Sequence, residues 1–265
     1  MRFNVCLLIA MKEMREIIAR SKLILSTVIG FPILLGVVMP TIFGVIMLPL
    51  IGEGSPGYFI PPLFPNWDLI SPGGQFYIFF INIYSGMFNL ILPLMIPVYI
   101  AADSFAGEKE RKTLEPILAA PVSDIEILIG KSLTSLIPAL TASLVAICLS
   151  TVSINLISYG IFGFIIYPVL PIIILYVFAI PLMSLLTVFS MVIVSSKVQK
   201  VREASQLGGI VIIPILLLFF TQIFGVLSLS VFTEGLFILL VLCLVVILIF
   251  AGLKIFNRQR LIESI

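Results

Sequence analysis

Long apolar runs without a charged residue dominate this sequence, and they limit the folds that the chain can adopt. Residues 23–50 form the first such run. About 20 apolar residues are enough for a helix to cross the hydrocarbon core of a bilayer. With 61% hydrophobic and 11% charged residues, the 265-residue chain carries more apolar surface than one soluble core can bury. We therefore predict an all-α polytopic membrane protein.

We expect a single transmembrane domain over residues 1–265, with six membrane spans. The segment 1–22 interleaves basic and apolar residues at helical spacing, which predicts an amphipathic helix on the membrane surface; a solvated basic tail is the alternative. The segment 51–75 is rich in proline, glycine and aromatic residues, which indicates an irregular interfacial loop. The expected spans are 23–50, 76–102, 132–154, 164–194, 208–227 and 235–253.

The positions of the basic residues predict the orientation of these spans. All 15 lysine and arginine residues lie before residue 23, within 103–131, within 195–207 or after residue 253. The three alternate connections, 51–75, 155–163 and 228–234, contain none. Because basic residues favour the cytoplasmic side, we expect both termini and segment 103–131 to be cytoplasmic, and loop 51–75 to be external. The net charge of +2 gives no indication of a nucleic-acid partner.

The sequence gives no sign of an active site, a cofactor site or a metal site. It contains no histidine, and Cys6, Cys148 and Cys243 lack metal-ligand spacing. No ionisable residue lies well inside an expected span, which disfavours ion-driven transport. Gly130-Lys131-Ser132 resembles the end of a phosphate-binding loop, but the first glycine of that motif is missing. We therefore expect a non-enzymatic chain without its own nucleotide site.

The most polar stretch of the chain is segment 103–131. Ser123 and Glu126 form a capping box, which predicts that a helix begins near Asp124 and continues into the third span. Before it, Thr113 can cap a short helix in which three apolar residues share a face: Leu114, Ile117 and Leu118. Such a helix fits the groove of a cytoplasmic partner, or else simply lies on the headgroups.

The run FAGEKERKTLEPILAAPVSDIEILIGK resembles the cytoplasmic segment between the second and third spans in type-2 permeases of ATP-binding cassette (ABC) exporters. The matching elements are an acidic-basic cluster at 108–111, a T-L-E element at 113–115, a P-V-S element at 121–123 and the closing Gly130-Lys131. The opening MKEMREIIARSKLILSTVIGFPILL is similar to the family's interfacial helix. Two departures are Lys112, where the family often has glycine, and the long external segment after the first span.

The resemblance implies an exporter permease of the plasma membrane, driven by a separate ABC ATPase subunit that binds ATP and Mg. It also implies a second permease copy, in a homodimer or a heterodimer. The cytoplasmic coupling helix between the second and third spans would dock in the ATPase. The residues implied in this contact are Glu108, Arg111, Thr113, Leu114, Glu115, Ile117 and Leu118.

Two other functions stay open on the sequence alone. The chain could be a non-transporting scaffold or assembly factor whose segment 103–131 binds another cytoplasmic partner, or an intramembrane enzyme. The transported substrate is not indicated. Several polar residues within or near the spans could line a path, although helix-to-helix hydrogen bonds are the commoner use of such residues: Asn82, Asn89, Thr141, Ser150, Thr151, Thr221 and Gln222.

Overall fold

The computed structural model describes residues 3–20, 22–52, 62–63, 67–111, 113, 122–210, 213 and 231–255, and their regular structure is entirely helical. This agrees with the predicted all-α class. Five helical stretches are long and apolar enough to cross a membrane: Ser26–Met47, Pro72–Glu110, Ile125–Phe162, Leu170–Ser195 and Glu234–Gly252. The expected span at 208–227 falls mostly outside the described residues, so the count of six stays a prediction.

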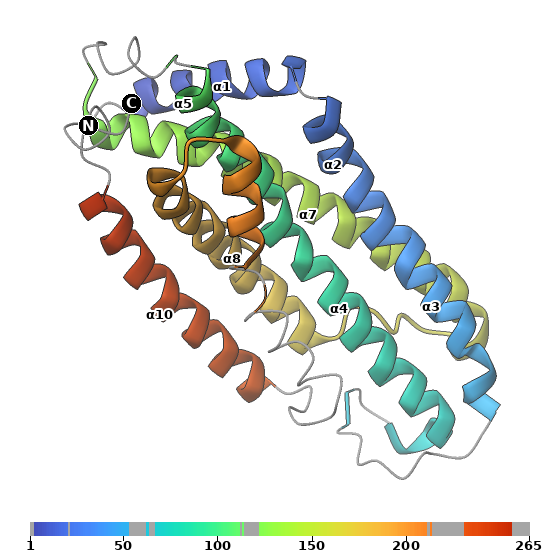
Figure 1. Cartoon of the computed structure of the whole chain (residues 1–265). Coiled ribbons are helices and arrows are strands. Elements are labelled where there is room, and N and C mark those ends of the chain that lie inside the picture. The colour runs from blue at the N-terminus through green and yellow to red at the C-terminus, as the bar shows by residue number, and fades with distance from the viewer. Residues whose placement is uncertain are drawn as a thin grey trace.

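The long helices lie side by side in an elongated bundle, and α1 lies across one end of it (Figure 1). Along the bundle, α10 packs on α8, α8 on α4, and α4 on α7, which also packs against α1, α2 and α3. Another helix covers 201–210. The elements are α1 (Phe3–Arg20), α2 (Lys22–Ile33), the π-helix η1 (Leu34–Val38), α3 (Met39–Met47), the 3-10 helices η2 (Leu48–Gly52) and η3 (Trp67–Leu69), α4 (Pro72–Ala101), the π-helix η4 (Ala102–Ala106), α5 (Gly107–Glu110), α7 (Asp124–Phe162), α8 (Leu170–Lys197) and α10 (Val231–Ile255).

Helix α1 has one buried face, which packs on α7. That face consists of Cys6, Ala10, Glu13 and Ile17, at alternating spacings of four, three and four residues. Residues at these spacings lie on the same side of an α-helix. The helix expected at 1–22 is therefore present, and one of its few acidic residues points into the protein. Its location on a membrane surface stays a prediction.

Helix α7 is longer than the span expected from the sequence. It begins at Asp124 behind the predicted capping box, in which both Ser123 and Glu126 form their hydrogen bonds. It then runs through the expected turn at 155–163 and ends at Gly163, whose φ of 74° is left-handed. Its 39 residues extend about 58 Å, roughly twice the thickness of the hydrocarbon core. Helix α7 is therefore too long to lie wholly within the hydrocarbon core along the membrane normal.

The connection at 163–169 is irregular, yet Ile166, Tyr167 and Val169 are buried. Two asparagines bind its backbone. Asn82 donates to the Ile166 carbonyl (2.9 Å) and accepts from the Val169 N–H (3.1 Å). Asn155 accepts from the Ile166 N–H (3.0 Å) and donates to the Tyr167 carbonyl (2.6 Å). Buried backbone polar groups must find hydrogen-bond partners, and these two side chains satisfy the Ile166 N–H and carbonyl, the Tyr167 carbonyl and the Val169 N–H.

At a second position, near a proline, a side chain forms a hydrogen bond with a backbone carbonyl. Pro40 has no N–H, so the Gly36 carbonyl lacks its usual α-helical donor. The hydroxyl of Ser150 on α7 donates to that carbonyl at 2.8 Å. A side chain at Gly36 would lie 2.8 Å from the Ala146 carbonyl, so the glycine permits this close approach of the first span to α7.

We expect Asn82→Leu to destabilise the bundle by about 2–4 kcal/mol, because each buried backbone group left unpaired costs about 1–3 kcal/mol. The loss is measured as a lower midpoint of thermal unfolding in detergent. Thr141→Val is the matched control, because the Thr141 hydroxyl is exposed and bonds only to carbonyls of its own helix. Equal midpoints for the two variants would contradict a role of Asn82 in holding 163–169.

Candidate functional site

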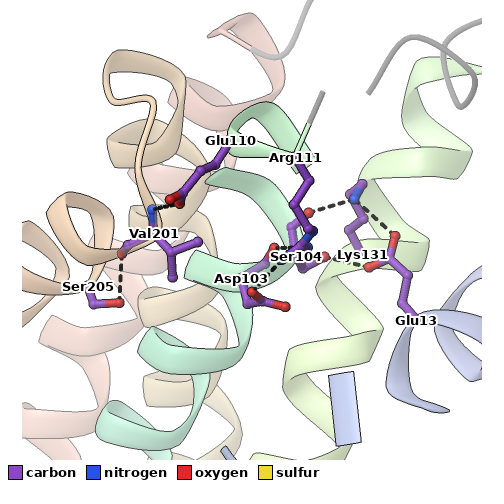
Figure 2. A network of polar contacts seen from close by, with 8 residues as sticks. All are labelled: Glu13, Asp103, Ser104, Glu110, Arg111, Lys131, Val201 and Ser205. Carbon is purple, nitrogen blue, oxygen red and sulfur yellow. Dashed lines mark hydrogen bonds and ion pairs between the residues drawn. The ribbon is translucent and has the colours of Figure 1, made fainter. Parts of the chain in front are cut away.

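Of the four consecutive charged residues 108–111, three lie on the short helix α5 and Arg111 is its C-cap residue; α5 ends the continuous helical rod that starts as α4. The four residues form the acidic-basic cluster of the sequence motif. The Lys109 ammonium donates to the Ser195 carbonyl near the end of α8 (2.9 Å), and the Glu110 carboxylate accepts from the Val201 N–H (2.9 Å). Val201 opens the helix at 201–210, where the first N–H groups lack intrahelical partners. Figure 2 shows the contact of Glu110 with Val201.

The other acidic residue of α5 belongs to a buried ionic cluster. The Lys131 ammonium, whose side chain is only 1% exposed, lies 2.6 Å from a carboxylate oxygen of Glu108 and 2.9 Å from one of Glu13. It also donates to the Ser104 carbonyl at 2.7 Å. The Ser104 hydroxyl donates to the second oxygen of Glu13. The Lys131 ammonium therefore contacts three elements: it forms ion pairs with Glu13 of α1 and Glu108 of α5, and a hydrogen bond with the Ser104 carbonyl of η4 (Figure 2, where Glu108 is not drawn).

Local packing explains why a lysine can be buried at this position. Its neighbour Gly130 has no side chain, and a Cβ there would lie 2.8 Å from Ile9 of α1. Helix α1 can therefore approach α7 closely enough for Glu13 to reach Lys131. The Phe105 ring lies 5.5 Å from the Lys131 ammonium and adds a cation–π contact. The closing Gly-Lys pair of the sequence motif thus joins α1 to α7.

The π-helix η4 brings backbone carbonyls into the same site. In it, the Gly107 N–H bonds to the Ala102 carbonyl five residues earlier. The carbonyls of Asp103 and Ser104 accept from the side chains of Arg111 (3.2 Å) and Lys131. Arg111 also forms an ion pair with the Asp103 carboxylate at 2.9 Å. π turns of this kind are frequent at functional sites.

Glu108 and Arg111 are the predicted contact residues whose side-chain contacts the structure gives, and both bind within the chain. Of Thr113, the structure places the backbone N–H, which donates to the Glu108 carbonyl at 3.0 Å. Sequence reasoning missed the partners Glu13, Asp103 and Ser104. A lone acidic residue on the buried face of α1 was the available signal for Glu13. The remaining predicted residues lie outside the described part of the chain: Leu114, Glu115, Ile117 and Leu118.

The polar residues considered for a path form a second network, in the middle of the bundle. The Asn89 amide lies within donor distance of the hydroxyls of Ser150 (2.9 Å), Tyr167 (3.1 Å) and Tyr176 (3.2 Å). The two tyrosine hydroxyls also bond to each other. These groups join α4, α7, α8 and the connection 163–169, so they hold the bundle together. Thr141 and Thr151 bond to carbonyls of their own helix, while Thr221 and Gln222 lie outside the described residues.

The charged residues 108–111 connect several helices to one another. Among the described residues, no group of three or more metal-ligating side chains is placed to hold a metal ion. The charged groups of α5 bind Lys131 of α7, the end of α8 and the helix at 201–210, and Lys131 in turn pairs with Glu13 of α1. A displacement of this one turn would therefore act on several helices together.

Removing Lys131 alone should destabilise the protein strongly. We expect Lys131→Met to lower the stability by about 3–5 kcal/mol, because it leaves two buried carboxylates without their cation. The neutral triple variant Lys131→Met, Glu13→Gln, Glu108→Gln should lie within about 1–2 kcal/mol of the native chain. Thermal unfolding in detergent measures both. A single variant as stable as the triple variant would contradict the burial of this cluster.

Comparison with known protein families gives one clear match. The model of the family described as ABC-2 family transporter protein matches residues 7–233 of the chain. The matched region includes most of α1, the whole α4–α5 rod, α7 and α8. A search of curated proteins found no significant match. Because the family match covers most of the chain, the protein belongs to the ABC-2 transporter family, as a membrane permease subunit of an ABC transporter.

Proposed function

We propose that the chain is the permease of an ATP-driven exporter, which moves a still unidentified substrate out of the cell. Six spans would place both termini on the cytoplasmic side of the plasma membrane. Two features support this proposal. The family match assigns the chain to ABC transporters, and the basic residues are confined to alternate connections of the expected spans.

A separate ATPase subunit, which carries ATP and Mg, docks on segment 103–131. Two permease copies, identical or not, pair in the membrane. Leu114, Ile117 and Leu118 form the apolar anchor of the docking helix, and Glu115 is a polar contact at its rim. Glu108 and Arg111 have partners within the chain, so we assign them to the base of the docking segment, where they position it.

The observation that carries this proposal is the set of contacts made by residues 108–111. Nucleotide-driven movement of an ATPase is useful only if the permease converts it into movement of its spans. The base of the docking segment binds α7 and α1 through Lys131, the end of α8 through Lys109, and the helix at 201–210 through Glu110. A push on the segment would therefore reach several helices at once.

Co-purification tests the docking. We expect an ABC ATPase to co-purify with the C-terminally tagged, gently solubilised chain, and to be lost from the variant Leu114→Ala, Ile117→Ala, Leu118→Ala, because the apolar anchor is then removed. Mass spectrometry identifies the recovered proteins. The control is Leu7→Ala, Leu8→Ala, Met11→Ala on α1, which also removes three exposed apolar side chains. Absence of any ATPase from intact permease dimers would contradict the exporter function and favour a scaffold.

Cysteine labelling tests the orientation. In a chain whose three natural cysteines are replaced by alanine, we expect a membrane-impermeant maleimide to label Gly57→Cys on intact cells. It should label Lys112→Cys only after the cells are permeabilised, because 103–131 faces the cytoplasm. The reverse pattern would contradict the proposed orientation and, with it, ATPase docking on this segment.

A further inference from the structure

The buried cluster around Lys131 contains more negative than positive charge. With all three side chains ionised, two carboxylates share one ammonium, and both lie within ion-pair distance of it. Arg111 does not correct the imbalance, because it is more exposed and pairs with Asp103. Burying a carboxylate is unfavourable unless its charge is well compensated. Each carboxylate therefore weakens the hold of Lys131 on the other.

Glu13 and Glu108 are not held equally. Both carboxylate oxygens of Glu13 have partners, namely Lys131 and the Ser104 hydroxyl. Glu13 also lies in the middle of the 18-residue helix α1, on the face packed against α7. Glu108 contacts the cluster through one carboxylate oxygen, which lies beside Lys131. Its helix, α5, has only four residues. Glu108 is therefore the carboxylate that can be withdrawn with less disruption.

Within the docking segment, Glu108 is directly connected to the expected docking helix. Its carbonyl accepts from the N–H of Thr113, the residue expected to cap that helix. On its other side lies the π-helix η4, in which the regular α-helical bonding of the rod is interrupted. A displacement of residues 113–118 would therefore pull on Glu108 first.

We propose that Glu108 is a releasable positioning residue of this transporter. Movement of the docking segment withdraws its carboxylate from Lys131, while Glu13 stays paired and keeps α1 on α7. The departure removes the excess negative charge, so the cluster that remains is a balanced pair. This inference rests on the proposed docking of an ATPase on 103–131, and it assigns the contact that docking controls.

Hydrogen exchange on the purified permease tests the proposal without any partner. Glu13→Gln keeps the size of the side chain and removes one of the two competing charges, so Lys131 should hold Glu108 more tightly. We expect amide exchange of residues 104–111 to slow by about threefold or more. Glu16→Gln is the matched control, because Glu16 is exposed on the same helix and pairs with Lys12. It should leave 104–111 unchanged.

The sign of the change separates a releasable contact from a static support. A static support that loses one of its ion pairs would loosen, so amide exchange of residues 104–111 would become faster in Glu13→Gln. That result overturns the proposal, and so does an exchange rate no different from that of Glu16→Gln. Glu108→Asp is an independent variant whose shortened side chain reaches Lys131 poorly. Glu108→Asp should speed amide exchange of residues 104–111 and leave the exchange of α1 unchanged. Faster exchange of α1 to the same extent would also overturn the proposal.

A second measurement separates this inference from the proposed function. With a co-purified ATPase, ATP and vanadate should speed exchange of 104–111 in the native complex, and less so in Glu13→Gln. An ATPase that co-purifies while Glu13→Gln fails to slow exchange overturns only the releasable contact. Slower exchange in Glu13→Gln without any co-purifying ATPase overturns the docking function, and with it the role given to Glu108.

Discussion

The contact of Lys131 with two carboxylates connects parts of the chain that are otherwise far apart in sequence. Glu13 belongs to α1, Glu108 to the end of the α4–α5 rod, and Lys131 to the first turns of α7. A charge buried this deeply is stable only while it keeps a partner of opposite charge, and here its two partners connect three helices. The neighbouring Gly130 allows the close approach of α1 that this pairing needs. The proposed coupling at this end of the molecule depends on that connection.

Elsewhere in the bundle, polar side chains form hydrogen bonds with backbone groups. Ser150 donates to a carbonyl deprived of its usual donor by Pro40, and Asn82 and Asn155 bind the irregular connection at 163–169. In a lipid environment every such group must find a partner within the protein. The central network of Asn89 with two tyrosines joins further helices in the same way. The bundle is thus firmly connected, which allows movement at the end that holds Lys131 to be passed along the helices.

Local features of the sequence predicted local structure well. The capping box of Ser123 and Glu126 gave the start of α7, and apolar runs gave the helical class. Long-range pairings were not predictable, because nothing near Lys131 indicates that Glu13 lies beside it. The turn expected at 155–163 is instead part of α7, and there the Asn155 side chain binds the backbone of 166–167. The docking helix expected after Thr113 falls outside the described residues.

The most direct measurement is an electron cryo-microscopy structure of the permease with its ATPase, without nucleotide and with ATP and vanadate. We expect Lys131 to lie within ion-pair distance of both Glu13 and Glu108 in the nucleotide-free complex. With ATP and vanadate it should keep Glu13 and lose Glu108, with Leu114, Ile117 and Leu118 seated in the ATPase. A Lys131 that keeps the same partners in both states, or that faces solvent in both, would contradict this expectation.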